Sequence, residues 1–390
     1  MPPKISYRFP KGFLWGTATS SHQIEGGNLN DWTIWEPGQI VDGSISGLAC
    51  DSYHRFKEDI ALAKKLNNNA YRFSIEWSRI EPSQGQFSRL ATKYYQDIIN
   101  ECHRQKIKPI VTIYHFTQPI WFAELGGWEN QAAPQIFNNY VLYLAQHLKK
   151  VKFWCTINEP GLYAWNAYGQ GKWPPQRISL IAWWKALNNM VYGHRLAYQS
   201  LHLSNKNCLV GIANNSQLIE AVNHKWINQQ LTRLITYIIN DYFFKKILGY
   251  QDYLGINYYF HRLVGLGRQP TQDLPRTDLG WTVNPQGLYT ILMAAKQYQL
   301  PVYILENGLA DHQDQQRQVF ITEHLKIIHR AISDGCPVKG YFHWSLLDNF
   351  EWKWGFTPRF GLYSVDYHSL ERRARPSSRR YAQICKNNGL

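Results

Sequence analysis

Short β-rich runs alternate with longer stretches of helical spacing from one end of this 390-residue sequence to the other. The runs are apolar on both faces, which is typical of strands in a parallel sheet that helices cover. About eight such units follow one another without a linker. Eight units predict a (β/α)₈ barrel, the TIM barrel of the α/β class, and we expect a single domain over residues 1–390. The predicted strands are 12–18, 70–75, 108–116, 151–158, 208–215, 253–259, 301–307 and 338–346.

A doubly wound parallel sheet is the alternative fold. Such sheets bind dinucleotides through a Gly-x-Gly-x-x-Gly turn after the first strand, and the sequence after residues 12–18 contains no such turn. The Gly-Leu-Gly at 265–267 is too short a match. The barrel is therefore the favoured interpretation.

Polar side chains stand at or just after the ends of nearly all the predicted strands. In a (β/α)₈ barrel these ends and the loops that follow them carry the functional residues. Glu159 ends the fourth strand and Glu306 the seventh, so we expect the two carboxyls to meet in one pocket from opposite sides of the barrel. The other candidates are Gln23, Arg72, His115, Asn158, Asn257, Tyr259, Trp344, Glu351 and Trp352.

Two facing carboxyls with aromatic walls and amide donors match what glycoside hydrolysis requires. One carboxylic acid protonates the leaving oxygen, and the other, as a carboxylate, attacks the sugar or activates water. Arg72 would keep the attacking group ionised, and Tyr259 could donate a hydrogen bond to it. Gln23, His115 and Asn158 suit hydroxyls on a sugar ring. Each of these residues alone is more often structural, but their order along the barrel favours a site.

The formal charge is +14, from 42 basic and 28 acidic residues. Such a balance can indicate nucleic acid, an anionic membrane surface or an anionic substrate. No long basic block or RNA-binding motif accompanies it, and the densest cluster is 371–380. A solvated basic surface is the favoured interpretation. Peripheral contact with an anionic surface and a nucleic-acid-binding protein are the alternatives, and no feature of the sequence predicts an oligomeric state.

Six cysteines lie far apart and form no Cys-x-x-Cys pair, so neither a zinc ribbon nor a thioredoxin-type redox site is expected. In a chain of this size they indicate reduced core thiols. The first residues contain no apolar leader, and no apolar run is long enough to span a bilayer. We therefore expect a cytoplasmic protein without a transmembrane segment. The sequon at 214–216 would matter only in a secreted protein.

Several blocks of the sequence resemble motifs of the family 1 glycoside hydrolases, the β-glucosidases and their relatives. They are FLWGTATSSHQIEG, YRFSIEWSRIEP, YHFTQP followed by GGW, TINEP, ILENG and GYFHWSLLDNFEWKWGFTPRFGL. The blocks run from about residue 9 to 385, and together they are very specific.

This resemblance implies a retaining β-glycosidase with Glu306 as the nucleophile and Glu159 as the general acid/base. It implies no metal or organic cofactor and a small-molecule β-glycoside as the partner, with no nucleic acid. The glycone would be bound by Gln23, His115, Asn158, Glu351 and Trp352, with Trp344 as the platform beneath it and Asn257 and Tyr259 supporting the nucleophile.

The chain departs from the family pattern at a few positions. Leu305 stands where many members have Thr, and Gln118 lies in a variable part of the third motif; neither removes a group that the mechanism needs. Relatives that act on 6-phosphorylated sugars have Ser in place of Glu351 and Lys in place of Pro358, which predicts a glycone without phosphate.

The chain is also shorter than most family members, and the shortening falls within 173–252 and 259–281. Those segments usually build the side of the site that holds the aglycone, so the leaving-group preference is open. A transglycosylase that uses the same covalent intermediate is an alternative. A carbohydrate-binding pseudoenzyme is disfavoured, because both carboxyls and the groups around them are present.

Overall fold

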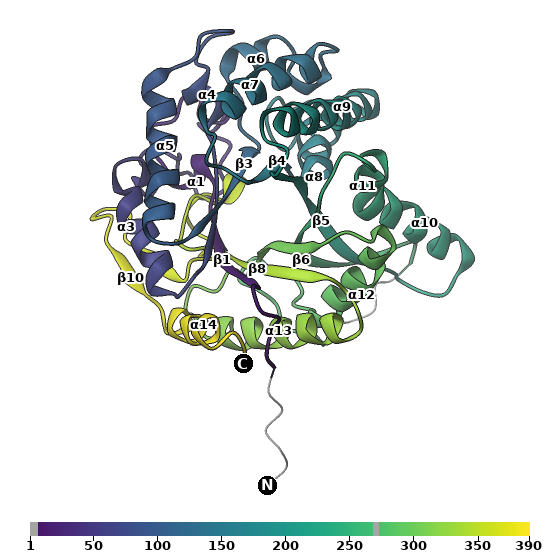
Figure 1. The fold of residues 1–390 in the computed structure, drawn as a ribbon. Helices are drawn as coiled ribbons and strands as arrows, with labels where there is room; N and C mark the ends of the chain where they lie inside the picture. Colours follow the sequence, from purple (N-terminus) through teal and green to yellow (C-terminus); the bar gives the residue numbers. More distant parts are fainter. Residues whose placement is uncertain (1–6, 268–272) are drawn as a thin grey trace.

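Eight parallel strands close into a barrel in chain order in the computed structural model, which describes residues 7–267 and 273–390 (Figure 1). The last strand pairs with the first, with Leu14 opposite Gly340 and Ala18 opposite Trp344. The predicted (β/α)₈ barrel is confirmed. Its strands are β1 (Leu14–Ala18), β2 (Ala70–Ser74), β3 (Lys108–Tyr114), β4 (Phe153–Asn158), β5 (Leu209–Ala221), β6 (Leu254–Val264), β7 (Val302–Asn307) and β8 (Val338–Trp344).

Helices surround the barrel on its outer side (Figure 1). Several begin at a side chain that accepts a backbone N–H bond, as Ser88 and Ser179 do, which is a common start signal. The longer helices are α3 (Ser52–Lys65), α5 (Arg89–Arg104), α7 (Ala133–His147), α9 (Leu180–Ser204), α10 (Trp226–Thr236), α12 (Pro285–Ala295), α13 (Arg317–Ser333) and α14 (Pro376–Asn387). The shorter ones are α1 (Ser21–Ile24), α2 (Asp31–Trp35), α4 (Trp77–Ile80), α6 (Ile120–Glu124), α8 (Pro160–Ala164) and α11 (Tyr242–Lys246).

The remaining elements are short. Two π-helical turns extend α8 and α10, and an antiparallel strand pair follows the barrel. They are η2 (Trp165–Gly169), η3 (Tyr237–Asp241), β9 (Tyr363–Val365) and β10 (Arg372–Ala374), with 3₁₀ turns η1 (Gly127–Glu129), η4 (Lys296–Tyr298) and η5 (Trp352–Trp354).

Apolar side chains fill both faces of the strands, as the continuous apolar runs predicted. One buried cluster includes Leu14, Ile110 and Phe342, which belong to the barrel interior, and a larger one lies between the strands and the helices. Arg72 interrupts the interior cluster from β2 and is completely buried. A charged side chain at such a position requires a partner of opposite charge.

Two strands are longer than the sequence predicted. β5 was expected to end at residue 215 and β6 at 259, but the structure extends them to Ala221 and Val264. The two strands pair with each other beyond the barrel, after a register shift between Ser216 and Leu218. This extension carries α10, which lies at the outer edge of the molecule in Figure 1.

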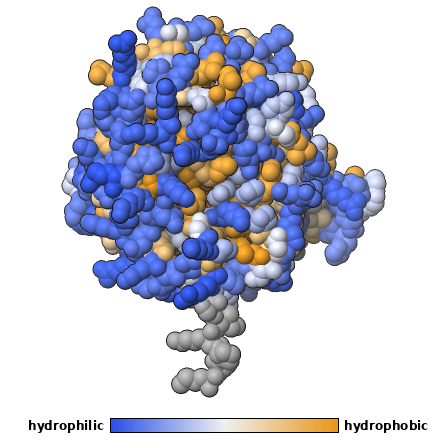
Figure 2. All heavy atoms as spheres, in the orientation of Figure 1, coloured by the Kyte–Doolittle hydropathy of each residue, from blue (hydrophilic) through white to orange (hydrophobic). Residues whose placement is uncertain are grey.

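The surface is mainly hydrophilic on the face shown in Figure 2, where hydrophobic side chains gather in small groups. Within the described residues, no helix combines the length and the apolar character that crossing a membrane requires. All six cysteines are buried free thiols, as predicted.

Gly308 explains why a glycine follows the Glu-Asn pair at the end of β7. A Cβ atom built on this residue would lie 1.7 Å from the carbonyl oxygen of Trp344 at the end of β8. The backbones of two neighbouring strand ends therefore approach each other to a distance that only glycine permits.

Replacing Gly308 with alanine should force these strand ends apart and destabilise the protein by about 1–3 kcal/mol or more, as overpacking does. Urea unfolding followed by tryptophan fluorescence measures the change. Gly161 is the matched control because it is helical and a Cβ atom there meets no atom within 4 Å. Gly161→Ala should stabilise by up to about 1 kcal/mol. Equal effects of the two substitutions would contradict the close approach.

Candidate active site

A cavity of about 690 Å³ opens at the carboxyl ends of the strands. This is the end of a (β/α)₈ barrel at which functional residues gather. Eight of the residues predicted from the sequence line this cavity: His115, Asn158, Glu159, Tyr259, Glu306, Trp344, Glu351 and Trp352. The other three, Gln23, Arg72 and Asn257, stand behind the wall and contact residues that line it.

Glu306 is held by two donors from different strands. Nη1 of Arg72 pairs with Oε1, and the hydroxyl of Tyr259 donates to Oε2 over 2.9 Å. Burial raises the pKa of Glu306 above its ordinary value, although the charge of Arg72 and the hydrogen bond from Tyr259 act in the opposite direction. The pair of donors therefore favours the carboxylate form of this side chain.

Glu159 is buried as well, but among the described residues only amides donate hydrogen bonds to its carboxyl group. Nδ2 of Asn215 and Nδ2 of Asn257 donate to the same oxygen, Oε1, over 3.0 and 2.8 Å. Burial, reinforced by the charge of Glu306, raises the pKa of Glu159 to about 8. Because Oε1 accepts both donors and none of the described residues donates to Oε2, the proton of the acid form belongs on Oε2.

The strand-to-helix turn at Glu159 is strained. Its φ of 44° lies in the left-handed region, and its backbone N–H donates to the carbonyl of Ala213 on β5. Pro160 then begins α8 at the first helical position, which proline favours. Phe116 and Trp352 also line the cavity with positive φ. Backbone strain of this kind is concentrated at functional sites.

A network of amides links the two carboxyls to the barrel interior. Arg72 donates from Nη2 to Oδ1 of Asn158 over 2.7 Å and from Nε to Thr112 over 3.1 Å. Asn257 donates from Nδ2 to Oδ1 of Asn158 over 3.2 Å as well as to Glu159. Strands β2, β3, β4, β6 and β7 thus contribute to one hydrogen-bonded unit.

Aromatic rings form one side of the cavity. The ring of His115 stacks with Trp344 and with Trp352, at centroid distances of 6.0 and 5.8 Å. Burial, together with the positive charge of Arg72, holds the pKa of His115 well below its ordinary value, so the ring is neutral. Its Nε2 accepts from Nδ2 of Asn158, which leaves the proton on Nδ1. Nδ1 has no partner among the described residues.

Glu351 is the third carboxyl of the cavity. Burial and the charge of Glu306 raise the pKa of Glu351 to about 8. Nε2 of Gln23 lies 3.3 Å from Oε2 of Glu351 and also donates to Asn349, while Oε1 of Gln23 accepts from Ser20. Gln23 thus fixes the loop that carries Glu351.

Sequence reasoning missed Asn215, which contacts Glu159 directly. It lies on β5, the one strand to which no candidate was assigned, and the polar run Asn214-Asn215-Ser216 at the predicted strand end was the available signal. It also missed Phe116 and Trp173, which line the cavity beside Trp352. Their ring centroids lie 4.9 Å apart.

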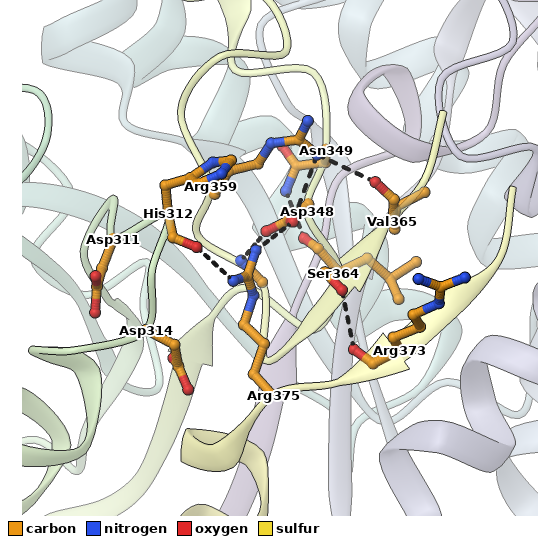
Figure 3. A network of polar contacts seen from close by, with 12 residues as sticks. Asp311, His312, Asp314, Asp348, Asn349, Arg359, Ser364, Val365, Arg373 and Arg375 are labelled. Carbon is orange, nitrogen blue, oxygen red and sulfur yellow. Dashed lines mark hydrogen bonds and ion pairs between the residues drawn. The ribbon is translucent and has the colours of Figure 1, made fainter. Parts of the chain in front are cut away.

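A buried ion cluster supports the loop between β8 and β9 (Figure 3). Asp348 is completely buried; its side chain accepts from Nη2 of Arg375 over 2.7 Å and from the backbone of Gly361 over 2.8 Å, and Arg359 lies 3.5 Å away. The next residue, Asn349, accepts from Gln23. The charges shown in Figure 3 therefore hold the segment that carries Glu351 and Trp352.

Carboxyls held in these two ways, one by a guanidinium and one by amides alone, are suited to acid-assisted cleavage of a glycosidic bond. The fold and the cavity together define a glycoside hydrolase. The model of the glycosyl hydrolase family 1 matches residues 5–255 and 261–390, and the chain belongs to this family.

Individual relatives extend over the whole chain. The sequence is 34% identical to β-glucosidase A of Thermotoga maritima over 440 residues, covering 98% of this chain and 99% of the relative. The structure is similar to a β-glycosidase from Pyrococcus horikoshii, with a TM-score of 0.92, 36% identity and coverage of 99% and 96%. It is also similar to the Thermotoga maritima β-glucosidase in complex with glucoimidazole, with a TM-score of 0.94, 33% identity and coverage of 98% and 100%.

Replacing Asp348 with asparagine should leave Arg375 and Arg359 without their buried counter-charge and cost about 3–5 kcal/mol of unfolding free energy. KM for a small aryl glycoside should rise, because the loop that carries Glu351 loses its anchor. Glu371→Gln breaks the exposed ion pair with Arg373 nearby and serves as the control, since exposed pairs contribute little. An unchanged unfolding midpoint in Asp348→Asn would contradict the supporting role.

Proposed function

We propose that this protein is a retaining β-glycosidase that removes terminal β-D-glycosyl residues, with β-glucosides as its preferred substrates. The observation that carries the proposal is the different environment of two buried carboxyls in one cavity. Glu306 is paired with Arg72 and serves as the nucleophile, while Glu159 is bonded to amides and serves as the general acid/base. The retaining mechanism is general in this family.

The first step forms a bond between a Glu306 oxygen and the anomeric carbon while the bond to the leaving oxygen breaks. Glu159 gives its proton to that oxygen, and the product alcohol leaves with it. Arg72 and Tyr259 bind the attacking carboxylate and fix its direction. The second step reverses the roles: water attacks the anomeric carbon, Glu159 takes the proton, and Glu306 is released as a carboxylate.

The charge of Glu306 acts on the pKa of Glu159, and this coupling explains how Glu159 serves as an acid in the first step and as a base in the second. Its pKa of about 8 rests on burial and, next, on the charge of Glu306. That charge disappears when Glu306 becomes an ester in the intermediate. The pKa of Glu159 then falls, and the side chain becomes a base when water must be deprotonated.

We assign glycone binding to the aromatic and polar side chains beside the carboxyls. His115 lines the cavity beside the carboxyls, and Trp344 offers a ring face for packing. Gln23, Asn158, Glu351 and Trp352 complete the predicted set. Glu351 favours neutral hydroxyls over a 6-phosphate.

We further propose a single catalytic domain over residues 1–390 that works in the cytoplasm on small-molecule β-glycosides and does not bind nucleic acid. Six buried free thiols support a reducing compartment. A reaction without metal or organic cofactor stays a prediction.

Initial rates on a panel of p-nitrophenyl β-glycosides test the proposal. Glucosides should react fastest, the 6-phosphoglucoside should react poorly, and proton NMR should show the β-anomer of the sugar before mutarotation. Quantifying transfer products beside free sugar separates hydrolysis from transglycosylation. Initial release of the α-anomer, or a preference for the phosphorylated sugar, would overturn the assignment.

The two carboxyls should fail in different ways when they are replaced. Glu306→Gln should abolish turnover of every substrate, since no covalent intermediate can form. Glu159→Gln should slow poor leaving groups by about 10²–10⁴-fold, because they need a proton, while activated aryl glycosides are still attacked. Stopped-flow measurement of phenol release across leaving groups checks this. Equal losses on good and poor leaving groups would contradict the two roles.

The pH profile of kcat/KM should follow the same division. Glu159 must be protonated in the first step, so activity should fall as the pH rises above its pKa of about 8. Glu306 must be ionised, so activity should fall as the pH drops through its pKa, which burial raises above the ordinary value. With an activated substrate, Glu159→Gln should lose the alkaline limb and keep the acidic one. An alkaline limb unchanged in this variant would show that another group carries it.

A further inference from the structure

The part of the cavity beyond the carboxyls has an apolar wall made by two segments. α9 contributes Trp183 and Leu187, and α10 with η3 contributes Ile235, Ile238 and Ile239. A single sugar ring occupies only a fraction of 690 Å³, so this wall faces whatever the glycone is attached to. Its chemistry suits an apolar aglycone.

The same two segments expose apolar side chains on their outer side. At the start of α9, Ile178, Leu180, Ile181 and Trp184 expose 81, 66, 70 and 47% of their surface. This cluster lies next to the residues of α9 that line the cavity. Apolar side chains gathered in this way usually mark an interaction site.

The second segment has the same character. Trp226, Ile227, Leu234 and Tyr237 are exposed by 72, 51, 55 and 39%, and Asn228 is the one buried residue of α10. The two segments adjoin, because the rings of Trp184 and Tyr237 both pack against the ring of Tyr242. The centroid distances are 5.1 and 6.2 Å. We call these eight exposed residues the 178–237 face.

The two sequence ranges that carry the 178–237 face contain only basic charges, and Glu220 and Asp241 stand just outside them. Residues 172–195 and 222–240 contain no Asp or Glu, and they contain six basic residues: Lys172, Arg177, Lys185, Arg195, Lys225 and Arg233. Arg177 pairs with Glu129 across 3.5 Å, whereas no described acidic residue pairs with Lys185, Lys225 or Arg233. The Nζ atom of Lys245 lies over the ring of Tyr237, 5.1 Å from its centroid.

We propose that the 178–237 face docks on an anionic lipid bilayer. Tryptophan and aliphatic side chains beside unpaired cations are the combination that binds such a surface, the first by entering the interface and the second by attraction to lipid charge. A second copy of this chain would place cations against cations. A nucleic acid would match the charge but would leave the apolar side chains uncovered.

Docking in this way would hold α9 and α10 with η3, whose inner side chains wall the cavity, next to the membrane surface. A glycoside anchored there by an apolar aglycone can then enter with its sugar toward the carboxyls while the aglycone stays against α9 and α10. This consequence rests on the proposed glycosidase function, whereas docking itself does not.

Sedimentation with lipid vesicles tests the docking. The protein should bind vesicles of phosphatidylcholine with phosphatidylglycerol and not vesicles of phosphatidylcholine alone, and salt should weaken the binding. Ile181→Glu with Trp226→Glu, and separately Lys185→Glu with Arg233→Glu, should each weaken partitioning by at least about tenfold. Leu90→Glu on α5 and Lys64→Glu on α3, both exposed, are the matched controls and should change nothing.

Turnover of a soluble aryl glycoside should be the same in all these variants, because none of the replaced residues lines the cavity. Equal binding to both vesicle types, or equal losses in the control variants, would overturn the docking and leave the proposed function intact. Vesicle binding without turnover would overturn the function instead. A dimer, or retention on duplex RNA, that the same substitutions abolish would assign the face to another occupant and overturn the docking.

Discussion

The buried ion pair between Arg72 and Glu306 is the interaction on which the site depends. Arg72 is completely buried on β2, and its guanidinium reaches both Glu306 on β7 and Asn158 on β4. A carboxylate in the barrel interior would be very costly without this partner, and the guanidinium would be equally costly without the carboxylate. The pair therefore explains how a charged side chain is tolerated among apolar neighbours in the barrel.

The second carboxyl is held by the same network with the opposite result. Asn257 donates to both Asn158 and Glu159, so the amides link the position of Glu159 to that of Arg72, while no hydrogen bond joins Arg72 to Glu159 among the described residues. Burial raises the pKa of Glu159, and the nearby charge of Glu306 raises it further. Because Arg72 pairs with only one of the two glutamates, Glu306 is suited to act as the nucleophile and Glu159 as the general acid.

Much of this arrangement could be predicted from the sequence, because it follows from the alternation of strand and helix patterns and from the polar residues at the strand ends. The eight strands appear as apolar runs, and the rule that barrel strands end at a common site brings Glu159 and Glu306 together. Asn215 could not be separated from an ordinary strand-end amide, since its role depends on contact with a side chain 56 residues away. The extension of β5 and β6 and the placement of α10 depend on pairing beyond the barrel. Gly308 is conspicuous in the sequence, but its reason is the carbonyl of Trp344, which only the fold brings near.

Trapping the covalent intermediate tests the central claim, the assignment of Glu306 as the nucleophile, most directly. A 2-deoxy-2-fluoro β-glucoside with an activated leaving group should inactivate the enzyme, because the fluorine slows both formation and hydrolysis of the glycosyl ester while the activated leaving group keeps formation fast. Mass spectrometry of a proteolytic digest should find one added fluoroglucosyl group on the peptide that contains Glu306. A label on Glu159 or Glu351 would contradict the account.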